Sequence, residues 1–154
     1  MKQTLLITIF ALCTNLLFAQ QIRSIDYQYE RKQEKYYAFE LFESDTFGVD
    51  SRLFIDFAAN DAFKKVKKIT LSDGSKEFKL KFGFREEQIK TDNPALNFYP
   101  IVIAWNDVTA NVLSCEAKIT FELDNGAAYS LPFDVCLINE ILKSDQNLIF
   151  AESL

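Results

Sequence analysis

Residues 115–135 decide the fold, and they read CEAKITFEL, then DNG, then AAYSLPFDV. In the first run, apolar residues alternate with polar ones from Cys115 to Leu123. Strict alternation is the period of a β-strand with one buried face and one face in water. The DNG segment between the two runs is a hairpin signal. The stretch therefore predicts an antiparallel hairpin at the centre of a small β domain.

The length of the hairpin loop sets which residues face each other. A two-residue loop pairs Phe121 with Ser130, whereas a three-residue loop with a left-handed Gly126 pairs Phe121 with Tyr129. A slip of one residue turns a whole strand's side chains to the other face. The three-residue loop places both apolar sets on the same face, so we predict that register.

The first 19 residues are typical of a secretory signal peptide. Lys2 gives a positive start, an apolar run extends from Leu5 to Leu17, and Ala19 stands at the cleavage position. The run is shorter than the ~20 apolar residues of a membrane-spanning helix, so we expect no membrane span after cleavage. We therefore predict that residues 20–154 form one domain, exported to the periplasm or the cell exterior.

The mature chain keeps two cysteines, Cys115 and Cys136. An oxidising compartment favours a disulfide between two such cysteines. The preferred hairpin register opposes it, because the two side chains would point to opposite faces and a bridge would need a backbone rearrangement. On that ground we predict two free thiols.

Alternation continues through most of the chain, and 15 phenylalanines against 4 glycines also favour strands. We expect an all-β, antiparallel β-sandwich of immunoglobulin-like type with a short C-terminal helix. A barrel of lipocalin type is the alternative, although its Gly-x-Trp signature near the start of the chain is absent, the only tryptophan being Trp105. Strands are predicted at 22–31, 35–43, 51–57, 65–71, 76–84 and 97–105, a turn at 106–107, a short helix from 137 and a last strand at 148–151.

The composition excludes several chemistries. The chain has no histidine, which removes Ser-His-Asp and Cys-His nucleophilic sites and histidine-ligated zinc. No glycine-rich loop could cradle a phosphate. We predict no catalytic residue, metal site or cofactor. A glycoside hydrolase with two carboxylates is the least favoured alternative, because Asp56, Glu86 and Glu87 form no recognisable catalytic pair.

Basic residues gather between Lys64 and Arg85. Seven lysines and one arginine stand there against one aspartate and one glutamate, a net charge of +6 in a chain whose net charge is −5. With a loop at Asp73-Gly74, Lys68 would face Lys79. One interpretation is a site for an anionic polysaccharide or an acidic protein surface, formed by Lys68, Lys79 and Lys81. The other is that the lysines keep an exposed strand from pairing with other chains. The export signal and the acidic remainder argue against nucleic acid.

Tyrosines suggest a second surface. Tyr36 and Tyr37 are neighbours, so a strand turns one of them outward, and we predict that this is Tyr36. It is a candidate binding residue for a sugar ring. The other aromatic residues that could share such a platform, Tyr27, Tyr29, Tyr99 and Trp105, are mostly expected in the core.

These observations favour a non-catalytic module that binds or assembles through protein or glycan contacts. The alternative is a carrier with an internal cavity for a small apolar ligand, suggested by the many phenylalanines. A sandwich would interdigitate these rings, whereas a barrel would place them around a void.

Overall fold

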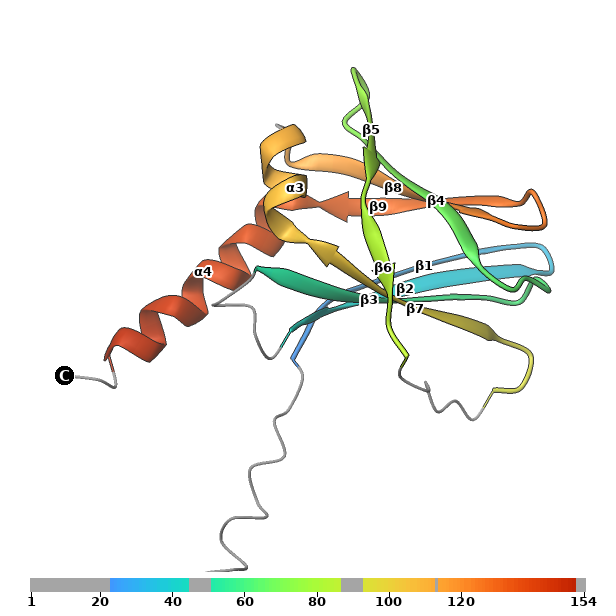
Figure 1. Cartoon of the computed structure of the whole chain (residues 1–154), viewed down its shortest axis with the longest axis horizontal. Helices are drawn as coiled ribbons and strands as arrows, with labels where there is room; N and C mark the ends of the chain where they lie inside the picture. Colours follow the sequence, from blue (N-terminus) through green and yellow to red (C-terminus); the bar gives the residue numbers. More distant parts are fainter. Residues whose placement is uncertain (1–22, 45–50, 87–92, 113, 152–154) are drawn as a thin grey trace, which may run out of the picture.

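The chain folds into two antiparallel sheets packed face to face (Figure 1). The computed structural model describes residues 23–44, 51–86, 93–112 and 114–151, the last seven as backbone. The signal sequence predicted over residues 1–19 lies outside these ranges. The sandwich that the sequence predicted is confirmed, and the lipocalin-type barrel is wrong because the sheets do not close on each other.

Each sheet has its strands in a defined order. Sheet A contains, in spatial order, β1 (Ser24–Lys32), β2 (Lys35–Glu43), β3 (Arg52–Ala59), β7 (Asn97–Ala104) and β6 (Phe82–Phe84). Sheet B contains β5 (Glu77–Leu80), β4 (Val66–Ser72), β8 (Glu116–Leu123) and β9 (Ala128–Asp134).

The central hairpin has the predicted three-residue register. Phe121 faces Tyr129, and the neighbouring pairs follow in step. Gly126 has a φ of 87°, a left-handed conformation that costs glycine little, and the Leu123 N–H donates to the carbonyl of Ala127 at 2.8 Å. The side chains of Ala117, Ile119, Phe121 and Leu123 are buried as a consequence.

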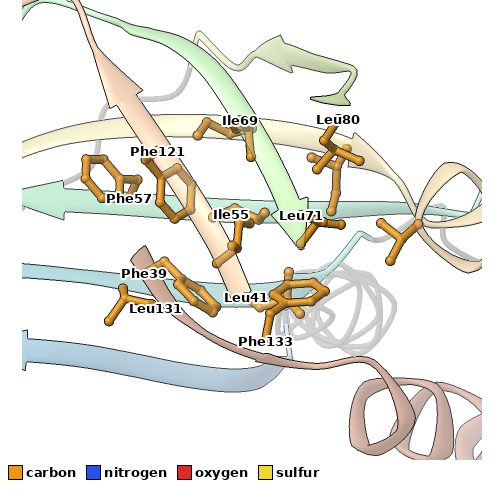
Figure 2. Packing of buried hydrophobic residues seen from close by; sticks show 14 of the residues in the cluster. Phe39, Leu41, Ile55, Phe57, Ile69, Leu71, Leu80, Phe121, Leu131 and Phe133 are labelled. Carbon is orange, nitrogen blue, oxygen red and sulfur yellow. The ribbon is translucent and has the colours of Figure 1, made fainter. Parts of the chain in front are cut away.

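Phenylalanines from both sheets interdigitate in the core (Figure 2). The rings of Phe57 on β3 and Phe121 on β8 are stacked with their centroids 4.4 Å apart. Phe39 on β2 contacts Phe121 and Phe133, each at 6.1 Å. All four rings are fully buried. Burial of a phenylalanine side chain contributes roughly 1.5–3 kcal/mol, so these contacts hold the two sheets together.

One side of the sandwich is closed by a strand that changes sheets. The alternating run from Glu77 to Phe84 continues through Lys81, but β5 pairs with β4 in sheet B and β6 pairs with β7 in sheet A. Figure 1 shows this segment crossing from one layer to the other. Gly83 lets β6 lie close against β7, because a Cβ there would lie 3.0 Å from the Cγ1 atom of its cross-strand partner Val102. On the other side, β1 and β9 are edge strands.

Two helices lie at one end of the sandwich, and both differ from prediction. The turn expected at 106–107 belongs to α3 (Trp105–Asn111), where Trp105 and Val108 are buried at helical spacing. The short C-terminal helix is confirmed as α4 (Val135–Ala151) but is longer than expected. It includes 148–151, which were predicted as a strand. Ile138 and Leu142, four residues apart, are buried on one side of α4.

Cys115 and Cys136 form a disulfide, so the prediction of free thiols was wrong. The register behind it was correct, but β9 ends at Asp134 and α4 begins at Val135. Alternation therefore no longer governs Cys136, and the helical backbone turns its side chain back toward Cys115, with the Cα atoms 4.8 Å apart. The Val135 N–H also donates to the Cys115 carbonyl at 2.9 Å.

Candidate functional site on the outer face of sheet A

The two outer faces of the sandwich differ in chemistry. The outer face of sheet B is polar, with a cross-strand row of Lys79, Thr70, Thr120 and Ser130 in which the two hydroxyl oxygens of Thr120 and Ser130 lie 2.7 Å apart. This is the usual pattern for a sheet with one wet face. The outer face of sheet A is instead aromatic and apolar over much of its area. An exposed face of this kind is where a binding site is expected.

Three tyrosines meet at the β1 side of this outer face, and we call them the tyrosine ledge: Tyr27, Tyr29 and Tyr36. The ring centroids of Tyr27 and Tyr29 are 5.9 Å apart, and those of Tyr29 and Tyr36 are 6.4 Å apart. The hydroxyl oxygens of Tyr27 and Tyr36 share a hydrogen bond of 2.6 Å. Half of Tyr27 and 63% of Tyr29 remain exposed. The ledge is thus an ordered aromatic surface that faces solvent.

The register explains why these rings point outward. Phe39 and Leu41 of β2 face the core and are fully buried. Gln28 is paired with Phe39, so the inward positions of β1 carry polar residues, and the tyrosines on either side of Gln28 point away from the core. The prediction that Tyr36 points outward and Tyr37 inward is confirmed. The expectation that Tyr27 and Tyr29 lie mostly in the core was wrong.

A carboxylate lies beside the ledge. Glu40 is the cross-strand partner of Tyr27, and it accepts a hydrogen bond of 2.8 Å from the Ser24 hydroxyl. Partial burial, followed by the hydrogen bond with Tyr36 and the charges nearby, raises the pKa of Tyr27 to about 12. The Tyr27 phenol is therefore neutral at physiological pH, and the ledge combines neutral rings with one anionic hydrogen-bond acceptor.

Glu40 has an acidic neighbour, Asp56, that sequence spacing did not reveal. Asp56 of β3 is its direct cross-strand partner, although 16 residues separate them in the chain. Asp56 forms an ion pair with Arg85, and the Arg85 guanidinium stacks on Phe54 with its carbon 4.4 Å from the ring centroid. The pair therefore differs from the protonated acid and free carboxylate that a glycoside hydrolase needs.

A polar groove adjoins the ledge at the open edge of the sandwich. It has a volume of about 580 Å³, and we call it the edge groove; its lining includes Tyr29, Glu30, Lys32, Tyr37, Lys118 and Ser130. Glu30 forms an ion pair of 2.5 Å with Lys32 and accepts a hydrogen bond from the Tyr37 hydroxyl; the contact with Lys32, followed by that with Tyr37, lowers the pKa of Glu30. Tyr29 belongs to both the ledge and the groove.

The predicted basic site lies elsewhere, on sheet B. The turn after β4 is longer than expected, so Lys79 faces Thr70, and the predicted Lys68–Lys79 pair was wrong. Lys68 is instead paired with Glu122 of β8 and lies 3.5 Å from a Glu77 carboxylate oxygen. Lys79 and Lys81 are exposed on and beside the edge strand β5. This placement fits lysines that protect an edge strand, and a binding role for the three lysines stays a prediction.

The remaining aromatic candidates are not part of the ledge. Trp105 is buried at the start of α3, where its ring contacts Phe133 at 6.5 Å. Tyr99 lies on the inner side of β7, paired with Phe57, and contacts Phe84 at 5.0 Å. The platform therefore consists of three of the five aromatic residues proposed from sequence.

Within the described ranges, no group of three metal-ligating side chains lies close enough together to hold a metal ion. In the same part of the chain, no helix has the length and hydropathy needed to cross a membrane. Comparison with protein-family models, with curated proteins and with solved structures found no match.

Proposed function

We propose that this protein is an exported, non-catalytic binding module that holds a saccharide chain on the tyrosine ledge. The observation that carries this proposal is the cluster of three mutually contacting tyrosines that face solvent beside Glu40. The C–H-rich face of a sugar ring stacks on an aromatic ring, and tyrosine adds a hydroxyl for hydrogen bonding. A carboxylate beside the rings can accept a hydrogen bond from a sugar hydroxyl.

The arrangement of the rings favours a saccharide over a cationic ligand. Quaternary ammonium groups bind in cages whose aromatic walls surround the charge. Here the planes of Tyr27 and Tyr29 are inclined by 31°, and those of Tyr29 and Tyr36 by 30°. The rings are thus closer to parallel than to perpendicular, which produces a surface rather than an enclosure.

Export is supported by two independent features. The first 19 residues have the pattern of a secretory signal peptide. The disulfide between Cys115 and Cys136 is typical of proteins that fold in an oxidising compartment. A polysaccharide ligand would be met in the periplasm or outside the cell, which agrees with this location.

The proposal is tested with the mature chain in a panel of soluble and insoluble polysaccharides, by affinity electrophoresis and pull-down. Tyr29→Ala should weaken binding at least tenfold, because truncating a central aromatic anchor costs about 2 kcal/mol or more and each ~1.4 kcal/mol is a factor of ten in affinity. Phe84→Ala is the matched control, since Phe84 is 56% exposed on β6 at the opposite edge of the same sheet. Equal loss in both variants, or no binding by the unmodified chain, would contradict the proposal.

A second candidate, a carboxylate-dependent glycoside hydrolase, is favoured by one observation. Glu40 and Asp56 are cross-strand partners next to Tyr27. The Arg85 ion pair with Asp56 counts against it. The hydrolase hypothesis predicts release of reducing sugar that disappears in Glu40→Gln, whereas the binding module predicts that no sugar is released.

A further inference from the structure

We infer that the saccharide is acidic, and that the edge groove binds its carboxylate groups while the tyrosine ledge binds its sugar rings. This inference rests on the proposed function, because it assigns the chemical class of the ligand. Tyr29 supplies the physical link, since its exposed side chain lines the groove and contacts both other tyrosines of the ledge. A chain lying on the ledge can therefore continue around β1 into the groove.

Cations outnumber anions where the ledge meets the groove. Lys32 and Lys118 line the groove together with one carboxylate, Glu30. Arg31 lies in the strand position after Glu30, is exposed, and faces Tyr36 on the ledge side. With Glu40 beside the ledge included, these three cations stand against two carboxylates, a local net charge of +1 in a protein that is acidic as a whole. Such a local excess attracts an anionic group.

The contacts within the groove leave the Lys118 ammonium group able to bind a ligand. Glu30 is already engaged by Lys32 and by the Tyr37 hydroxyl. Lys118 is exposed on β8 and faces Pro132, which carries no charge and no N–H donor. The side chain of Lys118 can therefore donate its hydrogen bonds to a carboxylate in the groove. The Ser130 hydroxyl beside it adds a neutral donor and acceptor.

The groove explains anion binding better than the basic hairpin does. The charge of Lys68 in the hairpin is offset by Glu77 and Glu122. Lys79 and Lys81 lie on and beside β5 at the edge of sheet B, whereas the tyrosine ledge belongs to sheet A. At the open edge, cations and stacked tyrosines adjoin. A polymer of uronic acids presents sugar rings and carboxylates together, so both parts of the surface would be used.

The test compares polymers that share a backbone but differ in charge: polygalacturonate and its methyl ester, and alginate and its propylene glycol ester. The mature chain should bind the acid form of at least one pair about tenfold more tightly than its ester at low ionic strength, and added salt should reduce that difference. The double variant Lys32→Gln with Lys118→Gln should lose the preference while still binding the ester. Lys79→Gln with Lys81→Gln is the matched control and should keep the preference.

The outcomes separate this inference from the proposed function. Equal binding of acid and ester by the unmodified chain would overturn the inference and leave the binding module intact. A preference that survives the groove variant but disappears in the hairpin control would also overturn it. If the unmodified chain bound none of these four polymers and no polysaccharide of the wider panel, the proposed function would be overturned as well.

Discussion

The hydroxyl groups of Tyr27 and Tyr36 share a hydrogen bond across β1 and β2, at a distance of 2.6 Å. The bond joins two rings that both lie on the outer face of sheet A, and Tyr29 contacts each of them. An exposed tyrosine on its own can adopt several rotamers, and ordering it on binding costs free energy. Mutual contact restricts the rings before a ligand arrives, which is the preorganisation that a binding surface requires.

The tyrosine contacts predict a distinctive titration. The pKa of Tyr27 is raised to about 12, mainly by burial and then by the bond to Tyr36, and burial with the bond to Glu30 raises that of Tyr37 to about 12. A tyrosine in the unfolded chain has a pKa of about 10. Because the folded pKa values are higher, the stabilisation from these groups is complete below pH ~10 and is lost as the pH rises toward ~12.

Phenolate absorbance measured against pH checks this directly. Folded protein should show a class of tyrosines that titrates near pH ~12, and denaturant should return it to pH ~10. Tyr27→Phe should remove part of that class. A single transition near pH ~10 for all six tyrosines of the folded chain would show that the contacts do not persist in solution.

The disulfide predicts the thiol content and part of the stability. Unfolded, unreduced mature protein should label with no equivalents of a thiol reagent. Replacing both cysteines by serine should lower the free energy of unfolding by about 3 kcal/mol, the chain-entropy value for a bridge between residues 21 positions apart. Denaturant unfolding measures the loss, and the reduced wild-type chain is the control. Two labelled thiols in a monomer would contradict the pairing.

The contact between the two sheets predicts a large core effect. Phe121→Ala removes a fully buried ring that stacks on Phe57 and should destabilise the fold by about 3–5 kcal/mol. Phe84→Ala removes a ring of the same size that is 56% exposed and contacts only the edge of the core through Tyr99, so it should cost about 1 kcal/mol or less. Urea unfolding of both variants provides the comparison. Similar losses would mean that the sheets are not held by the rings in Figure 2.

The corrected register of the basic hairpin predicts different effects for two lysines. Lys68→Glu places a like charge opposite Glu122 and near Glu77, so it should destabilise the fold by up to about 1 kcal/mol. Lys79→Glu faces the uncharged Thr70 and should have less effect. The two variants change the net charge equally, so a difference in melting temperature reports the local register. Equal melting temperatures at low salt would contradict it.

Sequence patterns predicted the strands well because burial imposes a period of two. The DNG turn and the apolar sets beside it fixed the central register, and β2 was predicted with its observed limits, Lys35–Glu43. The pattern misled at β1, where the alternating aromatic residues are exposed rather than buried. The tyrosines of β1 alternate with polar residues just as core residues would, and the β1–β2 register, which the sequence does not show, turns them outward.

The candidate site depends on pairings between distant residues. Tyr36 could be proposed from its neighbour Tyr37, because adjacent residues in a strand face opposite ways. Placing Tyr27 and Glu40 beside it required the β1–β2 register, and bringing Lys118 to the same edge required the packing of the two sheets. The disulfide was missed for a local reason, since the change from strand to helix at Val135 interrupts the alternation that the prediction used.

The segment that crosses from β5 to β6 also determines at which side the two sheets can separate. One continuous segment hydrogen-bonds in both sheets, so the layers cannot separate along that side without breaking pairing in each. The disulfide joins Cys115, the residue before β8, to Cys136 of α4, and it does not span the opposite side. Thermal motion that separates the two sheets, or a bulky ligand that enters the edge groove, should therefore increase the distance between β1 and β9. The amide hydrogens of these two strands should exchange with solvent before those of β3 and β4.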